Sequence, residues 1–205
     1  MIAIIDYGVG NLFSLTCSLK KIGAECAVIS DKSALRSASG LILPGVGAFG
    51  NAAEKLEESG LDKVIKELVY HGKPLLGICL GMQLLFEKSF EYGEHVGLGL
   101  IRGEIKPLDM YVKDLKIPHM GWNSLDIKNA GCPLFKYVSN GDYMYFVHSY
   151  CGVCNDKMQL AATASYGIEV TAAVADGNVF GTQFHPEKSG DAGLNILRAF
   201  AEIAG

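Results

Sequence analysis

Short apolar runs alternate with amphipathic segments along the first half of the chain. Apolar runs are typical of buried strands, whereas apolar residues three and four positions apart are typical of helices. Alternating strands and helices imply a parallel sheet covered on both faces. The pattern predicts strands at Ile2–Asp6, Ala24–Ile29, Leu41–Leu43 and Leu75–Ile78. It predicts helices from an Asn11 cap to Gly23, from an Asn51 cap to about Gly60, and over Leu61–Val69.

After about residue 98 the pattern changes to strands joined by short turns. Asp176-Gly177 is a hairpin signal, and a final helix begins near residue 190 with Leu194, Leu197 and Phe200 on one face. No repeat or linker divides the chain, so we expect one α/β domain over residues 1–205. Its central sheet would be mixed and largely parallel, flanked by helices, with an added antiparallel portion. The predicted strands are Ile101–Ile105, Ile117–Asn123, Tyr143–Cys151, Gln159–Ser165, Ile168–Ala175 and Val179–Phe184.

The composition is that of a folded globular protein. Apolar residues make up 49% of the 205 residues and charged residues 20%, which is too apolar for a disordered chain. The net charge of −4 argues against a nucleic-acid partner, because phosphate binding uses clustered Lys and Arg. No apolar run approaches the ~18 residues of a membrane span, and the start lacks a basic signal region. We therefore expect a cytoplasmic protein with no membrane partner.

The six cysteines do not form a disulfide framework, because a domain of this size buries a sufficient core without cross-links. Cys151-Gly-Val-Cys154 is a CxxC that could be half of a zinc site or a redox pair. The chain has no second CxxC, and no helix opens behind this one. Reduced thiols at a strand edge are the favoured interpretation, and we expect neither a metal nor a cofactor.

Gly77-Ile78-Cys79-Leu80-Gly81 is the sharpest local signal. It follows a buried strand and precedes a helical segment that Met82, Leu85 and Phe86 continue. This is the context of a nucleophile elbow with Cys in place of Ser. The helix start would favour the Cys79 thiolate, and the Leu80 N–H could bind an oxyanion. The alternative, a buried cysteine between packing glycines, stays open on these five residues alone.

A second segment, Thr182-Gln183-Phe184-His185-Pro186-Glu187-Lys188, would supply a base and its partner. A cysteine nucleophile needs a nearby base, and the base needs a third group to hold its tautomer. In an extended segment, His185 and Glu187 would project to one side, with Pro186 keeping the backbone extended. The other histidines fit other roles, on the surface for His71 and His95 and in packing or interfaces for His119 and His148.

A glycine-rich loop, Pro44-Gly45-Val46-Gly47-Ala48-Phe49-Gly50, follows the third predicted strand. Such a loop can cradle a phosphate, but no Lys-Ser/Thr follows and the pattern is not G-x-G-x-x-G. A second set of backbone N–H groups for an oxyanion beside Cys79 accounts for the same glycines.

With Cys79, His185, Glu187 and the Pro44–Gly47 loop in this order, the sequence resembles the class I (triad) glutamine amidotransferases. One branch of that family, the glutaminase subunits of imidazole glycerol phosphate synthase from histidine biosynthesis, is the most similar. The resemblance covers essentially the whole chain. Four stretches carry it: Ile5–Asn11, Pro44–Gly50, Pro118–Asn123 and Phe146–Tyr150.

The resemblance implies a role for each motif. Cys79 would attack the side-chain amide carbon of glutamine, His185 would move protons, and Glu187 would orient His185. The oxyanion would be bound by backbone amides of Leu80, Val46 and Gly47. The residues implied in binding L-glutamine are Gly45, Gln83, Glu91, His148, Ser149 and Tyr150.

The resemblance also implies a partner, a (β/α)₈-barrel cyclase that forms a heterodimer with this chain and uses the released ammonia. Ammonia in neutral water becomes mostly ammonium, which is not a nucleophile, so the two chains must form a sealed face. The candidates for that face are Asn11, His119, Trp122 and Tyr145, with ordinary packing as the alternative for Trp122.

Three other interpretations remain open. The chain could be a glutaminase for anthranilate, guanylate or pyridoxal phosphate synthesis, against which Pro118–Asn123 argues. It could be a cysteine hydrolase that acts alone on γ-glutamyl compounds, and full activity without a partner would favour that. It could also be a regulatory binding module, although such a module would be expected to lack one of Cys79, His185 and Glu187.

Overall fold

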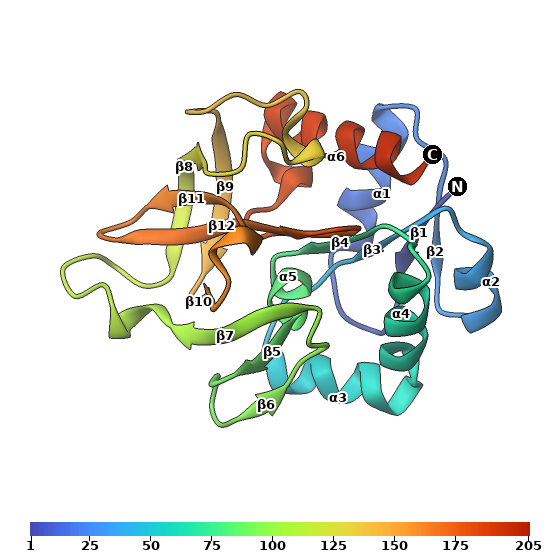
Figure 1. Ribbon diagram of the computed structural model, residues 1–205, viewed down its shortest axis with the longest axis horizontal. Coiled ribbons are helices and arrows are strands. Elements are labelled where there is room, and N and C mark those ends of the chain that lie inside the picture. Colours follow the sequence, from blue (N-terminus) through green and yellow to red (C-terminus); the bar gives the residue numbers. More distant parts are fainter.

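A nine-stranded mixed sheet forms the centre of the computed structural model, which describes residues 1–205 (Figure 1). Its strand order is β2-β1-β3-β4-β13-β12-β11-β8-β9. The first five strands are parallel and the others join antiparallel, so the predicted mixed sheet is confirmed. The parallel strands are β1 (Ile2–Ile5), β2 (Cys26–Ile29), β3 (Gly40–Leu43), β4 (Leu75–Ile78) and β13 (Val179–Thr182). The antiparallel strands are β12 (Glu169–Asp176), β11 (Leu160–Ser165), β8 (His119–Ile127) and β9 (Tyr143–His148).

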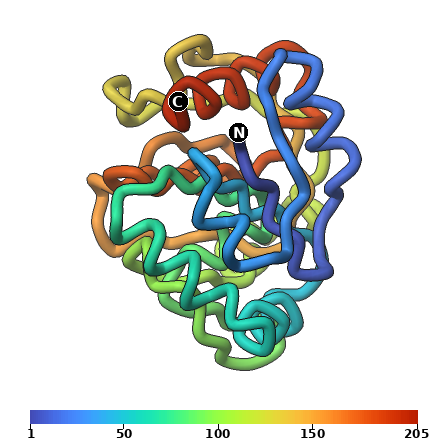
Figure 2. The backbone as a smooth tube through the Cα atoms, turned by 90° about the vertical axis from the view of Figure 1, so that its right-hand side faces the viewer, coloured from blue at the N-terminus to red at the C-terminus, as the bar shows by residue number.

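Helices cover both faces of the parallel half. The helices α1 and α6 lie on one face, and α3, α4 and α5 lie on the other (Figures 1 and 2). Strand side chains alternate between these layers, so Ile4 packs with Leu15 and Phe200, and Ile5 packs with Leu56. The helices are α1 (Leu12–Lys21), α2 (Lys32–Ser37), α3 (Phe49–Ser59), α4 (Leu61–Tyr70), α5 (Leu80–Leu84) and α6 (Gly190–Ala204).

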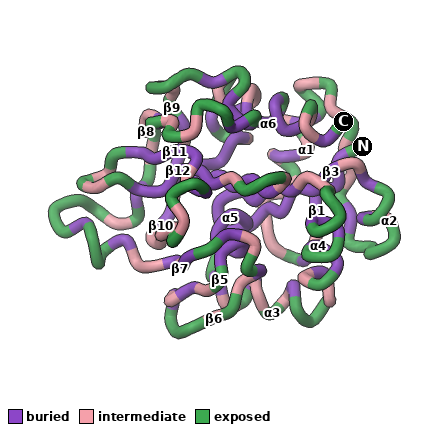
Figure 3. Tube along the Cα trace, viewed as in Figure 1, coloured by how far each residue is buried: buried purple, intermediate pink, exposed green.

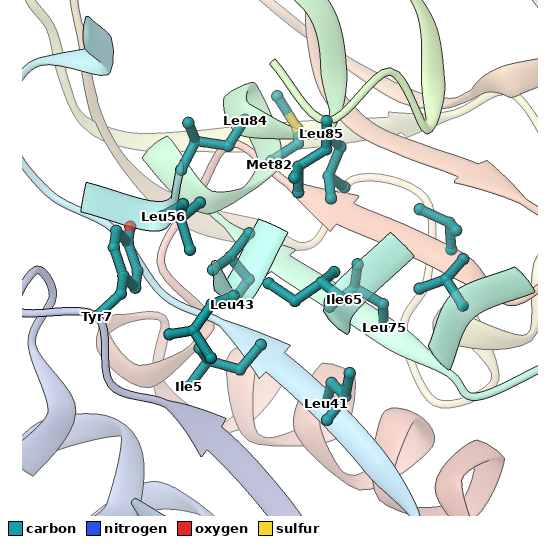
Figure 4. Packing of buried hydrophobic residues seen from close by; sticks show 14 of the residues in the cluster. Ile5, Tyr7, Leu41, Leu43, Leu56, Ile65, Leu75, Met82, Leu84 and Leu85 are labelled. Carbon is teal, nitrogen blue, oxygen red and sulfur yellow. The ribbon is translucent and has the colours of Figure 1, made fainter. Parts of the chain in front are cut away.

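The buried residues follow the central strands and α5, while the outer loops are exposed (Figure 3). Figure 4 shows one side of this core, where Tyr7 points toward Leu56 on α3 and where Met82 and Leu85 lie on the segment that follows β4. The predicted nucleophile elbow therefore lies in the buried centre of the molecule. No helix in the structure combines the length and apolarity needed to cross a bilayer.

A second, four-stranded sheet lies beside α5, in the order β10-β7-β5-β6 (Figure 1). The prediction of one strand over Tyr143–Cys151 is wrong, because the segment forms two strands that separate at Ser149. The first strand pairs with β8 in the large sheet, and the second pairs with β7 in the small sheet. A single straight strand cannot pair with both sheets. The strands are β10 (Tyr150–Cys154), β7 (Ile101–Pro107), β5 (Phe86–Ser89) and β6 (His95–Val96).

Two helix boundaries were predicted wrongly. Asn51 lies inside α3, which begins at Phe49, because the buried carboxylate of Glu91 accepts the Phe49 N–H at 2.5 Å and replaces a local cap. The helix after Cys79 ends at Leu84, and Phe86 already belongs to β5. The Asn11 cap is confirmed, since its side chain accepts the Ser14 N–H.

Candidate active site

Cys79 occupies a sharp turn between β4 and α5. Its backbone has φ 54° and ψ −110°, a conformation that costs a non-glycine residue energy and that collects at functional sites. The Cys79 N–H donates to the Thr182 carbonyl at 2.7 Å, which ties the turn to the end of β13. The backbone of Gly81 touches the chain at Leu43, so a side chain has no room there. This is the geometry of the predicted nucleophile elbow.

Gly81→Ala is expected to destabilise the fold by about 3 kcal/mol and to abolish activity, because overpacking against rigid backbone is poorly relieved. The added Cβ would lie 1.8 Å from the Leu43 carbonyl oxygen, which belongs to a central strand. Denaturant unfolding measures the loss. Gly131→Ala is the matched control, since its Cβ would meet only the flexible Asn129 side chain at 3.4 Å. Wild-type stability of Gly81→Ala would contradict this account of the elbow.

His185 and Glu187 form a buried hydrogen-bonded pair. The carboxylate accepts from Nδ1 of His185 at 2.8 Å, and both side chains are 3% exposed. Since a carboxylate only accepts, Nδ1 carries the proton and Nε2 is left for the thiol. The expected extended geometry is wrong in part, because residues 186–188 form a 3₁₀ turn that Pro186 begins. A proline suits the first position of such a turn.

His185 holds its proton strongly. Burial alone would lower its pKa, but interactions with Cys79 and Glu187 outweigh burial and raise the pKa to about 9. The imidazolium is therefore favoured at neutral pH in this site. Such a group can protonate a departing amine.

The glycine-rich loop runs beside the elbow. A Cβ on Gly45 would lie 2.8 Å from the Gly81 nitrogen and 2.9 Å from the Leu80 Cβ, so only glycine allows this approach. The N–H groups of Gly45, Val46, Gly47 and Leu80 have no hydrogen-bond partner within the chain. Free amides on two adjacent segments are what an oxyanion site requires.

Side chains anchor the two ends of this loop, Pro44 and Phe49. The Tyr7 hydroxyl donates to the Pro44 carbonyl at 2.8 Å, and the Glu91 carboxylate accepts from the Phe49 N–H at 2.5 Å. Burial, and then the charge of Cys79, raise the pKa of Tyr7, so its hydroxyl keeps the proton that it donates. Between these anchors Val46 is 43% exposed, and nothing lies within 4 Å of where a Gly47 Cβ would stand.

The sequence matches the family model "Glutamine amidotransferase class-I" over residues 3–203. The chain belongs to this family. It is 53% identical over 203 residues to "Imidazole glycerol phosphate synthase subunit HisH" of Bacillus cereus, covering 99% of this chain and 95% of that protein. The HisH subunit of Sulfurimonas denitrificans is 49% identical over 204 residues, covering 98% of each chain. The resemblance noted from the motifs is thus confirmed.

Solved structures support the amidotransferase fold. A structure titled "Crystal structure of glutamine amidotransferase" covers 100% of both chains with a TM-score of 0.78 at 20% identity. "Structure of PurLQS from Thermotoga maritima" covers 98% of this chain and 97% of that chain with a TM-score of 0.75 at 21% identity. At these identities the likeness concerns the fold.

Two of the side chains predicted to bind glutamine in this amidotransferase are buried and hydrogen-bonded to the backbone. Gln83, on α5, is 5% exposed and donates to the Tyr150 carbonyl at 3.2 Å. Glu91 is 9% exposed and holds the Phe49 end of the glycine-rich loop. Glu91 also borders a cavity of about 950 Å³ between α3 and β6, whose lining residues do not include Cys79.

The segment His148-Ser149-Tyr150, where β9 gives way to β10, is brought close to Cys79. The Val147 carbonyl lies 4.0 Å from the Cys79 Sγ. His148 donates from Nδ1 to the Tyr150 carbonyl at 2.8 Å, so its Nε2 accepts from His119 Nδ1 at 2.9 Å. Burial lowers the pKa of His119 to about 4 and that of His148 to about 3, so both rings are neutral at pH 7.

The four candidates for the partner face differ in exposure. Trp122 is 56% exposed, and its ring meets that of Tyr145 edge to face with centroids 6.1 Å apart. Asn11 is half-buried at the start of α1. The prediction for His119 is wrong, because its side chain is 2% exposed and stacks on Phe146, so it does not lie on the surface that a partner would contact.

Gln183 and Tyr7 were missed as contributors to the site. Both lie inside quoted motifs, but only the fold shows Gln183 beside Cys79 and Tyr7 beside Pro44. All six cysteines are free, and Cys151 and Cys154 lie on β10 at the edge of the small sheet, as expected for reduced thiols. No group of three metal-ligating side chains comes together.

Proposed function

We propose that this chain is the glutaminase subunit of a cytoplasmic imidazole glycerol phosphate synthase and that it passes ammonia to a (β/α)₈-barrel cyclase. The observation that carries the proposal is the buried His185–Glu187 pair beside a strained Cys79 elbow, in a chain about half identical to HisH subunits over its whole length. The identities to HisH argue against the anthranilate, guanylate and pyridoxal phosphate alternatives.

The first half-reaction transfers the acyl group to Cys79. The sulfur electron pair attacks the side-chain amide carbon of glutamine, and the C=O electrons move onto oxygen. The free N–H groups of Leu80 and of Val46 or Gly47 stabilise that oxyanion. The imidazolium of His185 protonates the nitrogen, and the oxyanion re-forms the C=O bond as the C–N bond breaks. Ammonia departs, and the acyl group stays on Cys79 as a thioester.

The second half-reaction hydrolyses the thioester and regenerates the free enzyme. His185, now neutral, takes a proton from water as the water oxygen attacks the thioester carbon. The C–S bond breaks, its electron pair returns to Cys79, and glutamate is released. Glu187 keeps Nδ1 protonated in both steps, so Nε2 is the atom that exchanges protons.

The substrate would lie between α5 and the glycine-rich loop. We assign Glu91 to the α-ammonium group by charge, and Gln83 to hydrogen bonding near Cys79. Gly45, His148, Ser149 and Tyr150 complete the walls, because the two segments that hold them meet at the elbow.

The exposed face of β8 and β9 fits the cyclase. Met120, Trp122 and Tyr143 are exposed there by 61%, 56% and 61%, and an exposed cluster of large apolar and aromatic side chains suits a desolvated interface. The face is joined directly to the site, since His185 N–H donates to the Tyr145 carbonyl at 3.0 Å. Ammonia would then travel only a short way before it is enclosed.

Partner-dependent activity tests this proposal. The middle of the glycine-rich loop lacks hydrogen bonds, so docking can change which amides face the oxyanion. We expect slow glutamate release by the chain alone, and at least about tenfold stimulation with barrel cyclase and its nucleotide ligand, which needs only about 1.4 kcal/mol.

The measurement compares glutamate release by the chain alone, with cyclase, and with cyclase plus nucleotide. Anthranilate, guanylate and pyridoxal phosphate synthase partners serve as controls. Equal rates in all three mixtures would rule out a glycine-rich loop that changes its amide orientation when the cyclase docks. Full activity without any partner would favour a cysteine hydrolase that acts alone.

A further inference from the structure

Gln183 is a fully buried amide beside the nucleophile, and no step above uses it. It follows β13, has 0% exposure, and its Nε2 lies 3.7 Å from the Cys79 Sγ. Burying a primary amide is costly unless its polar atoms find partners. The hydrogen-bond partners of Gln183 therefore indicate the role of its buried amide.

The orientation of the Gln183 amide follows from its neighbours. Gln83 Nε2 has two N–H groups, and both point at acceptors, the Tyr150 carbonyl at 3.2 Å and Gln183 Oε1 at 3.0 Å. A reversed Gln83 would direct its own oxygen at the Tyr150 carbonyl, which also accepts from His148. The oxygen of Gln183 thus faces Gln83, and its N–H group faces the Cys79 sulfur.

Two neighbours of the sulfur favour opposite states of Cys79. The Val147 carbonyl, 4.0 Å from Sγ, can only accept, so it favours the protonated thiol. The Gln183 N–H can only donate, and a hydrogen bond to an ionised acceptor is roughly twice as strong as one to a neutral acceptor. Of the two, only Gln183 stabilises the thiolate.

We propose that Gln183 is a further catalytic residue, whose amide N–H donates to the Cys79 sulfur and stabilises the thiolate before attack and after thioester hydrolysis. In attack the sulfur electron pair becomes the C–S bond, and the hydrogen bond weakens. When that bond breaks, the electron pair returns to the sulfur, which again accepts a hydrogen bond from the Gln183 N–H. The role in turnover rests on the proposed glutaminase function, whereas the effect on the thiol does not.

The test is the pH dependence of Cys79 alkylation by iodoacetamide, followed by peptide mass spectrometry. Gln183→Met removes the donor at nearly constant volume. Loss of a hydrogen bond to a charged group should move the inflection upward by about one to two pH units and lower kcat about tenfold to a hundredfold. We expect KM for glutamine to change much less than kcat. Gln159→Met is the matched control, because Gln159 is 5% exposed and bonds to Arg102 and Asp176 away from the elbow.

A second variant protects the test against loss of folding. Gln183→Glu keeps an oxygen for Gln83 and replaces the donor with a carboxylate, so its alkylation inflection should also move to higher pH. A wild-type inflection in either folded variant overturns the proposal. If the wild-type chain hydrolyses no glutamine but the inflection still moves, the proposed function fails and the inference about Gln183 stands.

Discussion

Cys79→Ala should abolish glutamine hydrolysis, with a loss of at least about ten-thousandfold in turnover. No other thiol can replace it, because the elbow alone holds a sulfur next to His185 and the free Leu80 amide. The complex with the cyclase should still make imidazole glycerol phosphate from added ammonium salts, since in the proposed scheme the second reaction belongs to the barrel.

Two assays on one preparation measure this result, glutamate release and ammonium-dependent synthesis. Cys151→Ala is the matched control, because Cys151 is also buried, at 3% exposure, but lies on β10 in the small sheet. Glutamine turnover that persists in Cys79→Ala would identify another nucleophile. Loss of both activities would mean that the substitution harms docking as well.

The parallel half of the fold follows from local hydrophobic pattern. Strands β1, β3 and β4 are each buried at every position. A strand buried on both faces has a continuous apolar run in its sequence, which the hydrophobic pattern reveals. The antiparallel half is harder to predict because pairing there depends on distant partners. The hydrophobic pattern within Tyr143–Cys151 contains no signal that the chain leaves the large sheet at Ser149 and pairs with β7.

Boundaries set by distant residues were also beyond local prediction. The start of α3 depends on Glu91, 42 residues after Phe49. The site shows the same division. The elbow and the His185–Glu187 pair are recognisable because each is contained in a few consecutive residues. The role of Gln183 can be inferred only from its hydrogen bond to Gln83, which is 100 residues away in the sequence.

His185→Ala should lower turnover about as much as Cys79→Ala does, and Glu187→Gln should lower it about tenfold to a hundredfold less. The imidazole moves the proton, whereas the carboxylate keeps Nδ1 protonated and stabilises the imidazolium. An amide at position 187 can still accept from Nδ1 through its oxygen, but it carries no charge. The expected defect of Glu187→Gln is therefore electrostatic.

The pH profile gives that defect a direction. Burial lowers the pKa of His185, and the interactions with Cys79 and Glu187 raise it to about 9. Removing the Glu187 charge removes one of the raising interactions, so the imidazolium loses its proton at lower pH. Because the protonated ring must supply the proton to departing ammonia, the alkaline limb of kcat should move to lower pH in Glu187→Gln.

Steady-state kinetics of both variants from acidic to alkaline pH provide the measurement, with Glu202→Gln as the control for an exposed carboxylate. Equal losses in His185→Ala and Glu187→Gln, with no movement of the alkaline limb, would mean that Glu187 only holds the 3₁₀ turn of residues 186–188 in place. Unaltered kinetics in Glu187→Gln would remove it from the triad, and the buried 2.8 Å hydrogen bond would then be structural.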